Sequence, residues 1–118
     1  MLGTYKEQSQ EIPFDSLRVD DKLIINTQNN QYQFRVVDPS HNRGILTGGL
    51  LGSQPYEAVL VCSLDSNAER ISEKAIKANM SLLFLLDWQN GAKHLFTSPI
   101  TSIKRIPVIF GDTTRWNC

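Results

Sequence analysis

Apolar and polar residues alternate along several short segments, and the clearest is the stretch from Ser81 to Ser98. At its centre stands Asn90-Gly91, a dipeptide that tolerates the positive φ angles of a tight type I′ hairpin turn. With this dipeptide at the turn, Leu86 pairs with Leu95. Alternation then places Leu82, Phe84, Leu86, Trp88 and Leu95 on one face and Leu83, Leu85 and Phe96 on the other. Both faces are apolar, so we expect this hairpin in the middle of the fold.

The same alternation predicts a second hairpin from 22–27 (KLIINT) and 32–38 (YQFRVVD). With Asn29-Asn30 at its turn, Ile25 pairs with Phe34, and nearly every apolar residue falls on one face. A slip of one residue in a strand would reverse that strand's faces. The pattern therefore predicts one buried face and one mostly polar face.

Further short strands are expected at 45–47, 56–64 and 100–106, separated by turn-forming residues. In 56–64, alternation places Cys62 on the same face as Leu60. Gly48-Gly49 interrupts the pattern, as a bulge or the corner of a small barrel would. We therefore predict an all-β fold of about six or seven short antiparallel strands, a meander that closes into a small barrel or a rolled sheet.

The stretch from Asp65 to Met80 fits two structures. Ser66 and Glu69 have the spacing of a capping box, and a thin apolar stripe follows at helical intervals, which predicts a short helix within 66–78. The alternative is a loop, a strand at 75–77, and a turn with Asn79 in the left-handed region. The pattern leaves both open.

A length of 118 residues predicts a single β domain over 1–118. Residues 1–16 are expected to form an N-terminal arm, with Ile12-Pro13-Phe14 docked on the body. Residues 107–118 form a C-terminal tail. This tail carries Phe110 and Trp116, more apolar surface than a free tail usually has, so we expect it to pack on the body or on another copy.

Charge and composition narrow the classes of function. Lys+Arg and Asp+Glu are both 12, and the resulting zero net charge argues against nucleic acid as a partner and favours self-association. The longest apolar run, 82–86, is too short to span a bilayer. The first residues show no apolar signal segment, so we expect a cytoplasmic protein in which Cys62 and Cys118 are reduced thiols.

The stretch from Ile76 onward contains Asn79-Met80 in a turn-like context and then Thr97-Ser98-Pro99-Ile100. In these features it resembles a group of short uncharacterised bacterial proteins with a Gly/Asn-Met turn and a C-terminal Thr-Ser-Pro-[Val/Ile] segment. The resemblance covers about a third of the chain. It implies a bacterial source and a strand around 75–77, and it implies no chemistry.

Candidate catalytic chemistry rests on Asp87 and His94, which oppose each other if Asn90-Gly91 forms the turn. An Asp–His pair orients a general base in many enzymes, so one hypothesis is a small hydrolase-like enzyme that uses these residues. The competing interpretation is a structural cross-strand polar pair. Cys62 lies in an apolar strand and is expected to be buried and inert. His41 and His94 are the only histidines and lack metal-ligand spacing, so we predict no metal and no cofactor.

Candidate binding residues are Trp88 and Lys93, which oppose each other in the same register and have the chemistry of a cation–π pair. Together with Arg35 and Tyr32 they have the composition of a ligand surface; ordinary sheet packing is the alternative. The leading hypothesis is a non-catalytic binding or assembly module, built as a small β-barrel, that forms a homo-oligomer, such as a homodimer, or binds a protein partner. The enzyme that uses Asp87 and His94 is the alternative.

Overall fold

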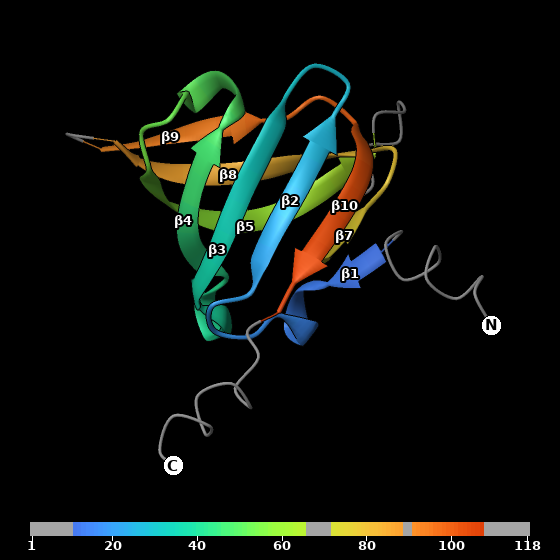
Figure 1. The fold of residues 1–118 in the computed structure, drawn as a ribbon, viewed down its shortest axis with the longest axis horizontal. Helices are drawn as coiled ribbons and strands as arrows, with labels where there is room; N and C mark the ends of the chain where they lie inside the picture. The colour runs from blue at the N-terminus through green and yellow to red at the C-terminus, as the bar shows by residue number, and fades with distance from the viewer. Residues whose placement is uncertain (1–10, 66–71, 89–90, 108–118) are drawn as a thin grey trace, which may run out of the picture.

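The computed structural model describes residues 11–65, 72–88 and 91–107, and the chain is all-β there, as predicted (Figure 1). The strands are β1 (Glu11–Pro13), β2 (Lys22–Thr27), β3 (Gln31–Asp38), β4 (Arg43–Gly48), β5 (Tyr56–Asp65), β6 (Ser72–Glu73), β7 (Ala75–Lys77), β8 (Met80–Trp88), β9 (Gly91–Phe96) and β10 (Ile100–Ile106). Three single 3-10 turns are η1 (Phe14–Ser16), η2 (Pro39–His41) and η3 (Gly49–Leu51). Within 66–78, the described residues form strands rather than the alternative helix, and 66–71 lie outside the described residues.

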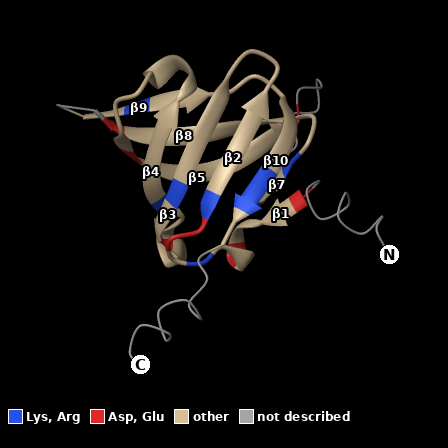
Figure 2. Ribbon diagram, in the orientation of Figure 1, with Lys and Arg blue, Asp and Glu red and all other residues tan. Residues whose placement is uncertain are grey.

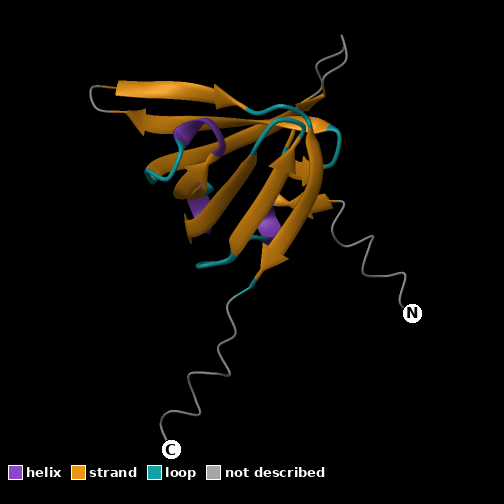
Figure 3. Ribbon diagram, turned by 45° about the horizontal axis from the view of Figure 1, so that its top comes forward, coloured by secondary structure: helices purple, strands orange, loops and turns teal. Residues whose placement is uncertain are grey.

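The main sheet is an antiparallel meander that stays open. Its strand order is β10-β2-β3-β4-β5-β8-β9, with β6 paired to β5, while β1 and β7 form a small second sheet. β10 and β9 are the two ends of this order, so the barrel in the prediction is wrong and the rolled sheet is right. In Figures 1 and 3 the β4-β3-β2-β10 layer runs across the β5-β8-β9 layer, and the β8–β9 hairpin projects beyond it.

The core lies between these two crossing layers. The inward side chains of both layers are apolar and nearly inaccessible, and the largest of them are Tyr32, Phe34, Phe84, Leu23, Ile25, Leu46, Leu60, Leu82 and Ile100. The rings of Phe34 and Phe84 meet across the layers with centroids 5.3 Å apart and a tilt of 57°. Such a pair contributes about 0.5–1.5 kcal/mol beyond its area burial. This contact joins the β4-β3-β2-β10 layer to the β5-β8-β9 layer.

The predicted registers of both hairpins are wrong, although the predicted faces are right. In β8–β9, Leu86 pairs with Lys93 rather than Leu95, and Gly91 pairs with Trp88 instead of occupying a central turn position. In β2–β3, Ile25 pairs with Tyr32 rather than Phe34. Each partner is displaced by two positions, and a shift of two residues keeps every side chain on its face.

The turn between β2 and β3 explains the displacement. Thr27 closes it by donating its N–H to the Asn30 carbonyl at 2.8 Å, and its Oγ1 accepts the Asn30 N–H at 3.0 Å. The central residues are therefore Gln28 and Asn29, and neither has a positive φ. The prediction placed Asn29-Asn30 at the turn, whereas the Thr27 hydrogen bonds close it one residue earlier. Residues 89 and 90 of the other hairpin lie outside the described residues.

A bulge in β5 changes which side chains are buried. The pairing with β8 shifts between Leu60 and Cys62, so the faces switch along the strand. Ser63 is fully buried and donates its hydroxyl to the Ala75 carbonyl at 2.5 Å, whereas Cys62 is only half-buried. The predicted burial of Cys62 beside Leu60 is wrong for this reason.

The N-terminal segment and β10 are joined to the body at one end of the fold. Ile12 and Phe14 are buried, as the predicted docking requires. Arg105 donates through Nε and Nη2 to Oδ2 of buried Asp21 at 3.1 and 2.8 Å. It also donates to the Ser16 carbonyl. This arrangement ties the edge strand β10 to the segment before β2. Residues 1–10 and 108–118, which include the predicted contact of Trp116, lie outside the described residues.

Candidate functional site

The strongest candidate site lies on the outer face of the β5-β8-β9 layer, which faces away from the core. Its outward side chains follow from the register: Val59 pairs with Leu85, Leu85 with His94, and Leu83 with Phe96. Val59, Leu83 and Leu85 are half-buried, and Phe96 is 54% exposed. We call Val59, Leu83, Leu85 and Phe96 the outer apolar face. The sequence predicted that this hairpin is apolar on both sides, and the structure leaves the outer side uncovered by the described residues.

A hollow of about 370 Å³ adjoins this face, on the side of β4 and β5. The residues that line it include Arg43, Glu57, Val59, Leu85, Asp87 and Ala92. We call it the outer groove. Its lining combines half-buried apolar side chains with the exposed charged groups of Arg43, Glu57 and Asp87, which we call its rim. Arg43 and Glu57 come from neighbouring strands, and their Nη2 and Oε1 atoms are 3.2 Å apart. Both side chains are more than half exposed, so this ion pair contributes at most about 1 kcal/mol.

The rim charges fall into two neighbouring rows. Arg43 pairs with Val59, and the row continues through Leu85 to His94, so it has the Arg43 guanidinium at one end and the His94 imidazole at the other. Glu57 and Asp87 both line the groove and belong to the next row. The row that contains Arg43 therefore lies beside a row that contains two carboxylates.

The predicted catalytic pair is not assembled. Asp87 pairs with Ala92, and His94 pairs with Leu85, so the two side chains are not opposite each other. Both are exposed on the outer face. The error has the same cause as the hairpin register, because the hypothesis required Asn90-Gly91 at the turn. Asp87 still belongs to the outer groove, but as a rim charge.

The predicted binding residues are also separated. Lys93 pairs with Leu86 rather than Trp88. Tyr32 is 1% exposed, because its ring packs against Gly49 in the core, so it cannot line a ligand surface. Arg35 lies on the opposite face of β3 and forms an ion pair with Asp20 at 3.4 Å. These side chains therefore do not form one surface.

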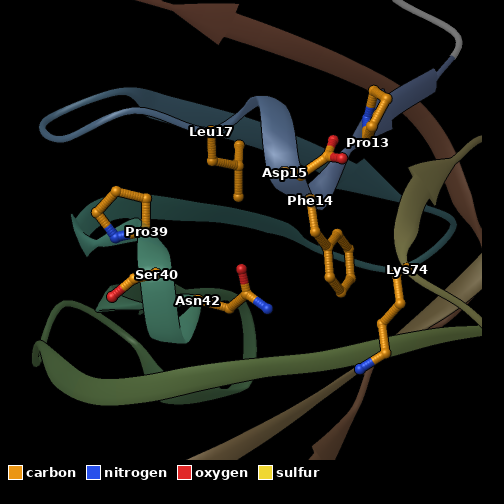
Figure 4. Close-up of a pocket in the computed structure, with 8 residues that line it drawn as sticks. All are labelled: Pro13, Phe14, Asp15, Leu17, Pro39, Ser40, Asn42 and Lys74. Atoms are coloured by element: carbon orange, nitrogen blue, oxygen red, sulfur yellow. The ribbon is translucent and has the colours of Figure 1, made fainter.

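A second hollow, of about 620 Å³, lies between η1, η2 and the β6–β7 connection (Figure 4). Its lining includes Phe14, Asp15, Asn42 and Lys74. In Figure 4 the Lys74 amine points away from Asp15, and the Phe14 ring stands between Asp15 and the amine. The polar groups do not converge on a common point, as a substrate or cofactor site requires.

The structure also brings a serine, a histidine and an aspartate together in η2. The Ser40 hydroxyl donates to Oδ1 of Asp38 at 2.7 Å, and Nδ1 of His41 lies 2.8 Å from Oδ2. In a catalytic triad the serine meets Nε2, the ring nitrogen that the aspartate does not contact. Here the serine also contacts Nδ1, at 3.1 Å, and the group is exposed. It is a cap for η2 rather than a nucleophile.

The Ser40 hydroxyl and then the His41 ring hold the pKa of the Asp38 carboxyl below its ordinary value of 3.8. The stabilisation of this cap is therefore complete above pH 3.8 and is lost as the pH falls through the lowered pKa. We expect an NMR titration of the Asp38 carboxyl to show a pKa below 3.8, and Ser40→Ala to move it back upward. An unchanged titration in Ser40→Ala would refute the assigned cause.

Comparison with known proteins adds no assignment. No protein-family model, curated protein or solved structure matches this chain. Among the described residues, no three His, Cys, Asp or Glu side chains gather as metal ligands would. The described part of the chain also contains no helix long and apolar enough to cross a membrane.

Sequence reasoning found Leu83, Leu85, Asp87 and Phe96 but missed Arg43 and Glu57. Their place in the outer groove depends on the β4–β5 register, which pairs Arg43 with Val59. No turn dipeptide signals that register, because η3 and an irregular loop join the two strands. The sequence does indicate an outward apolar surface here, because 56–64 and the 81–98 hairpin are apolar on both faces.

Proposed function

We propose that this chain is a non-catalytic binding and assembly module, and that its outer apolar face binds a second copy of the chain. The observation that carries the proposal is the set of outward apolar side chains on three adjacent strands, which includes the half-exposed ring of Phe96. Aromatic anchors are enriched in interface cores. If this face contacted only water, its aromatic and apolar side chains would contribute no binding energy.

A second copy is favoured over an unlike partner by the charges around this face. Near-zero net charge removes long-range repulsion between copies. A two-fold axis that lies in the plane of the face, between the two rows, exchanges the rows. Glu57 of one copy then faces Val59 of the other, beside Arg43, and Asp87 faces Leu85, beside His94. Two-fold dimers are the commonest oligomers, and their contact uses the same patch twice.

The outer apolar face alone is smaller than a standard dimer contact, so we expect the contact to extend over the charged rows. A standard interface buries roughly 800 Å² per partner, more than four partly exposed side chains provide. The outer groove and its rim supply the additional surface. The enzyme alternative loses its geometric basis, since Asp87 and His94 lie in different cross-strand pairs.

Phe96→Asp is expected to weaken self-association by at least about tenfold, because it places a charge within the outer apolar face. The measurement is sedimentation velocity of the full chain over a concentration series. Gln33→Asp is the matched control, since Gln33 is exposed on the outer face of β3 in the other layer. Phe96 is exposed, so the variant keeps its fold, and circular dichroism checks this.

Equal association of Phe96→Asp and the wild-type chain would contradict this assignment of the interface. Leu85→Asp provides an independent second test from the neighbouring strand. A wild-type chain that binds a different protein through this face while remaining monomeric would also refute the second copy as the occupant.

A further inference from the structure

A second surface lies on the opposite side of the molecule, on the outward face of β10, β2 and β3. In Figure 2 the lysine and arginine positions of these three strands form one band across the front of the sheet. Lys22 pairs directly with Arg35, and Lys104 pairs with Ile24, one step along the same face. We call Lys22, Arg35 and Lys104 the basic band. The net charge of the whole chain is zero and therefore gives no sign of this local group of cations.

The basic band brings like charges together on neighbouring strands. Like charges directly opposite each other in a sheet are destabilising, and Lys22 and Arg35 are such a pair. Arg35 has a carboxylate neighbour in Asp20, at 3.4 Å. Within the described parts of the chain, Lys22 and Lys104 form no ion pair. Two exposed lysines therefore have no counter-charge among the described residues and stand beside a third cation.

Amides and hydroxyls surround the band. Gln31 donates from Nε2 to Oδ1 of Asn26 at 2.8 Å, and Asn26 donates from Nδ2 to Ser102 Oγ at 2.9 Å. These bonds hold a ladder of polar groups across the three strands. Gln33 pairs with Ile24 and lies exposed between the ladder and the cations. The face thus offers ordered donors and acceptors next to its positive charges.

No aromatic side chain of β2, β3 or β10 lies on this face. The two aromatic residues of β3, Tyr32 and Phe34, point into the core. Single-stranded nucleic acids bind by stacking bases on exposed rings, each worth about 1–3 kcal/mol, and these three strands offer no such ring. Hydrogen bonding to hydroxyls and charge pairing with carboxylates remain. Both groups occur together in acidic polysaccharides.

We propose that the basic band and its amide ladder bind a carboxylated polysaccharide. The cations pair with its carboxylates, and Gln31, Gln33 and Asn26 bond to its hydroxyls. Charge complementarity and the polar ladder support this ligand. This binding does not depend on the outer apolar face, which lies on the other layer.

Polygalacturonate oligosaccharides are the probe, measured against the full chain by isothermal titration calorimetry at low salt. We expect saturable binding that weakens as salt is added, because salt screens exposed charges. Lys22→Gln and Lys104→Gln should each lower the affinity by about three- to fivefold, the scale of one exposed ion pair. Lys74→Gln is the control, since it removes the same charge from the β6–β7 connection.

Three results would overturn the proposal: no saturable binding of polygalacturonate, equal affinity of the Lys22→Gln and wild-type chains, or an equal effect of Lys74→Gln. A neutral dextran should not bind, and dextran binding would show that the cations are not the determinants. Tighter binding of a single-stranded or duplex DNA of similar charge would assign the band to nucleic acid instead. Thermal unfolding gives a second measurement, because polygalacturonate should raise the midpoint of the wild-type chain more than that of Lys22→Gln.

Discussion

Arg105→Ala is expected to lower the free energy of unfolding by about 3 kcal/mol, because it leaves the carboxylate of Asp21 buried without its counter-charge. The Asp21 side chain is 2% exposed and that of Arg105 is 29% exposed. The Arg18 N–H also donates to the same carboxylate oxygen, at 3.0 Å, but carries no full charge. A loss of 3 kcal/mol corresponds to a fall in melting temperature of roughly 10–15 °C.

The control for this prediction is Lys104→Ala, on the same strand. Lys104 is exposed and forms no ion pair with a described residue, so its removal should change stability by less than about 0.5 kcal/mol. The double variant Arg105→Ala with Asp21→Ala should lose less than the sum of the single losses, since the residues contact each other. Additive losses, or equal effects of Arg105→Ala and Lys104→Ala, would show that the ion pair does not support the fold.

Gly44→Ala should be the other strongly destabilising substitution, with a loss of about 3 kcal/mol from overpacking. A Cβ at Gly44 would overlap the Arg35 carbonyl oxygen and lie 2.9 Å from the Phe34 ring. Neither neighbour moves easily, because one is sheet backbone and the other is the ring that packs on Phe84. Urea unfolding measures the loss.

Gly91→Ala is the matched glycine control and also tests the corrected turn. A Cβ at Gly91 has no atom within 4 Å, and its φ is not positive. We expect no loss, and a gain of up to about 1 kcal/mol from the stiffer unfolded chain. The turn predicted with Asn90-Gly91 at its centre requires a positive φ at Gly91, so it predicts that Gly91→Ala lowers the stability. Marked destabilisation by Gly91→Ala would restore that turn and contradict the observed pairing of Gly91 with Trp88.

Alternation of apolar residues predicted the strands because it reports which side of a strand is buried. The segment 100–106 and the alternative strand at 75–77 have the bounds of β10 and β7. The predicted left-handed Asn79 is confirmed, with a φ of 73°. Alternation has a period of two, so it cannot separate registers that differ by two residues. That is why Leu86 was given the wrong partner while its face was right.

Features that depend on distant segments had no local signal. The bulge in β5 leaves the sequence pattern intact, and only the pairing of Cys62 with Leu83 reveals it. Asp21 and Arg105 are 84 positions apart. The basic band also depends on distant segments, since Lys104 adjoins Lys22 only when β10 pairs with β2. The net charge of zero described the chain as a whole and concealed how its charges are distributed.

Self-association through the outer apolar face is the central claim, and sedimentation equilibrium of the wild-type chain tests it most directly. The chain mass is 13.3 kDa. From about 1 to about 100 µM, the range of a weak specific contact, the average mass should rise toward twice that value. Phe96→Asp should stay at the mass of one chain over the same range. A wild-type mass of one chain at every concentration would contradict the claim.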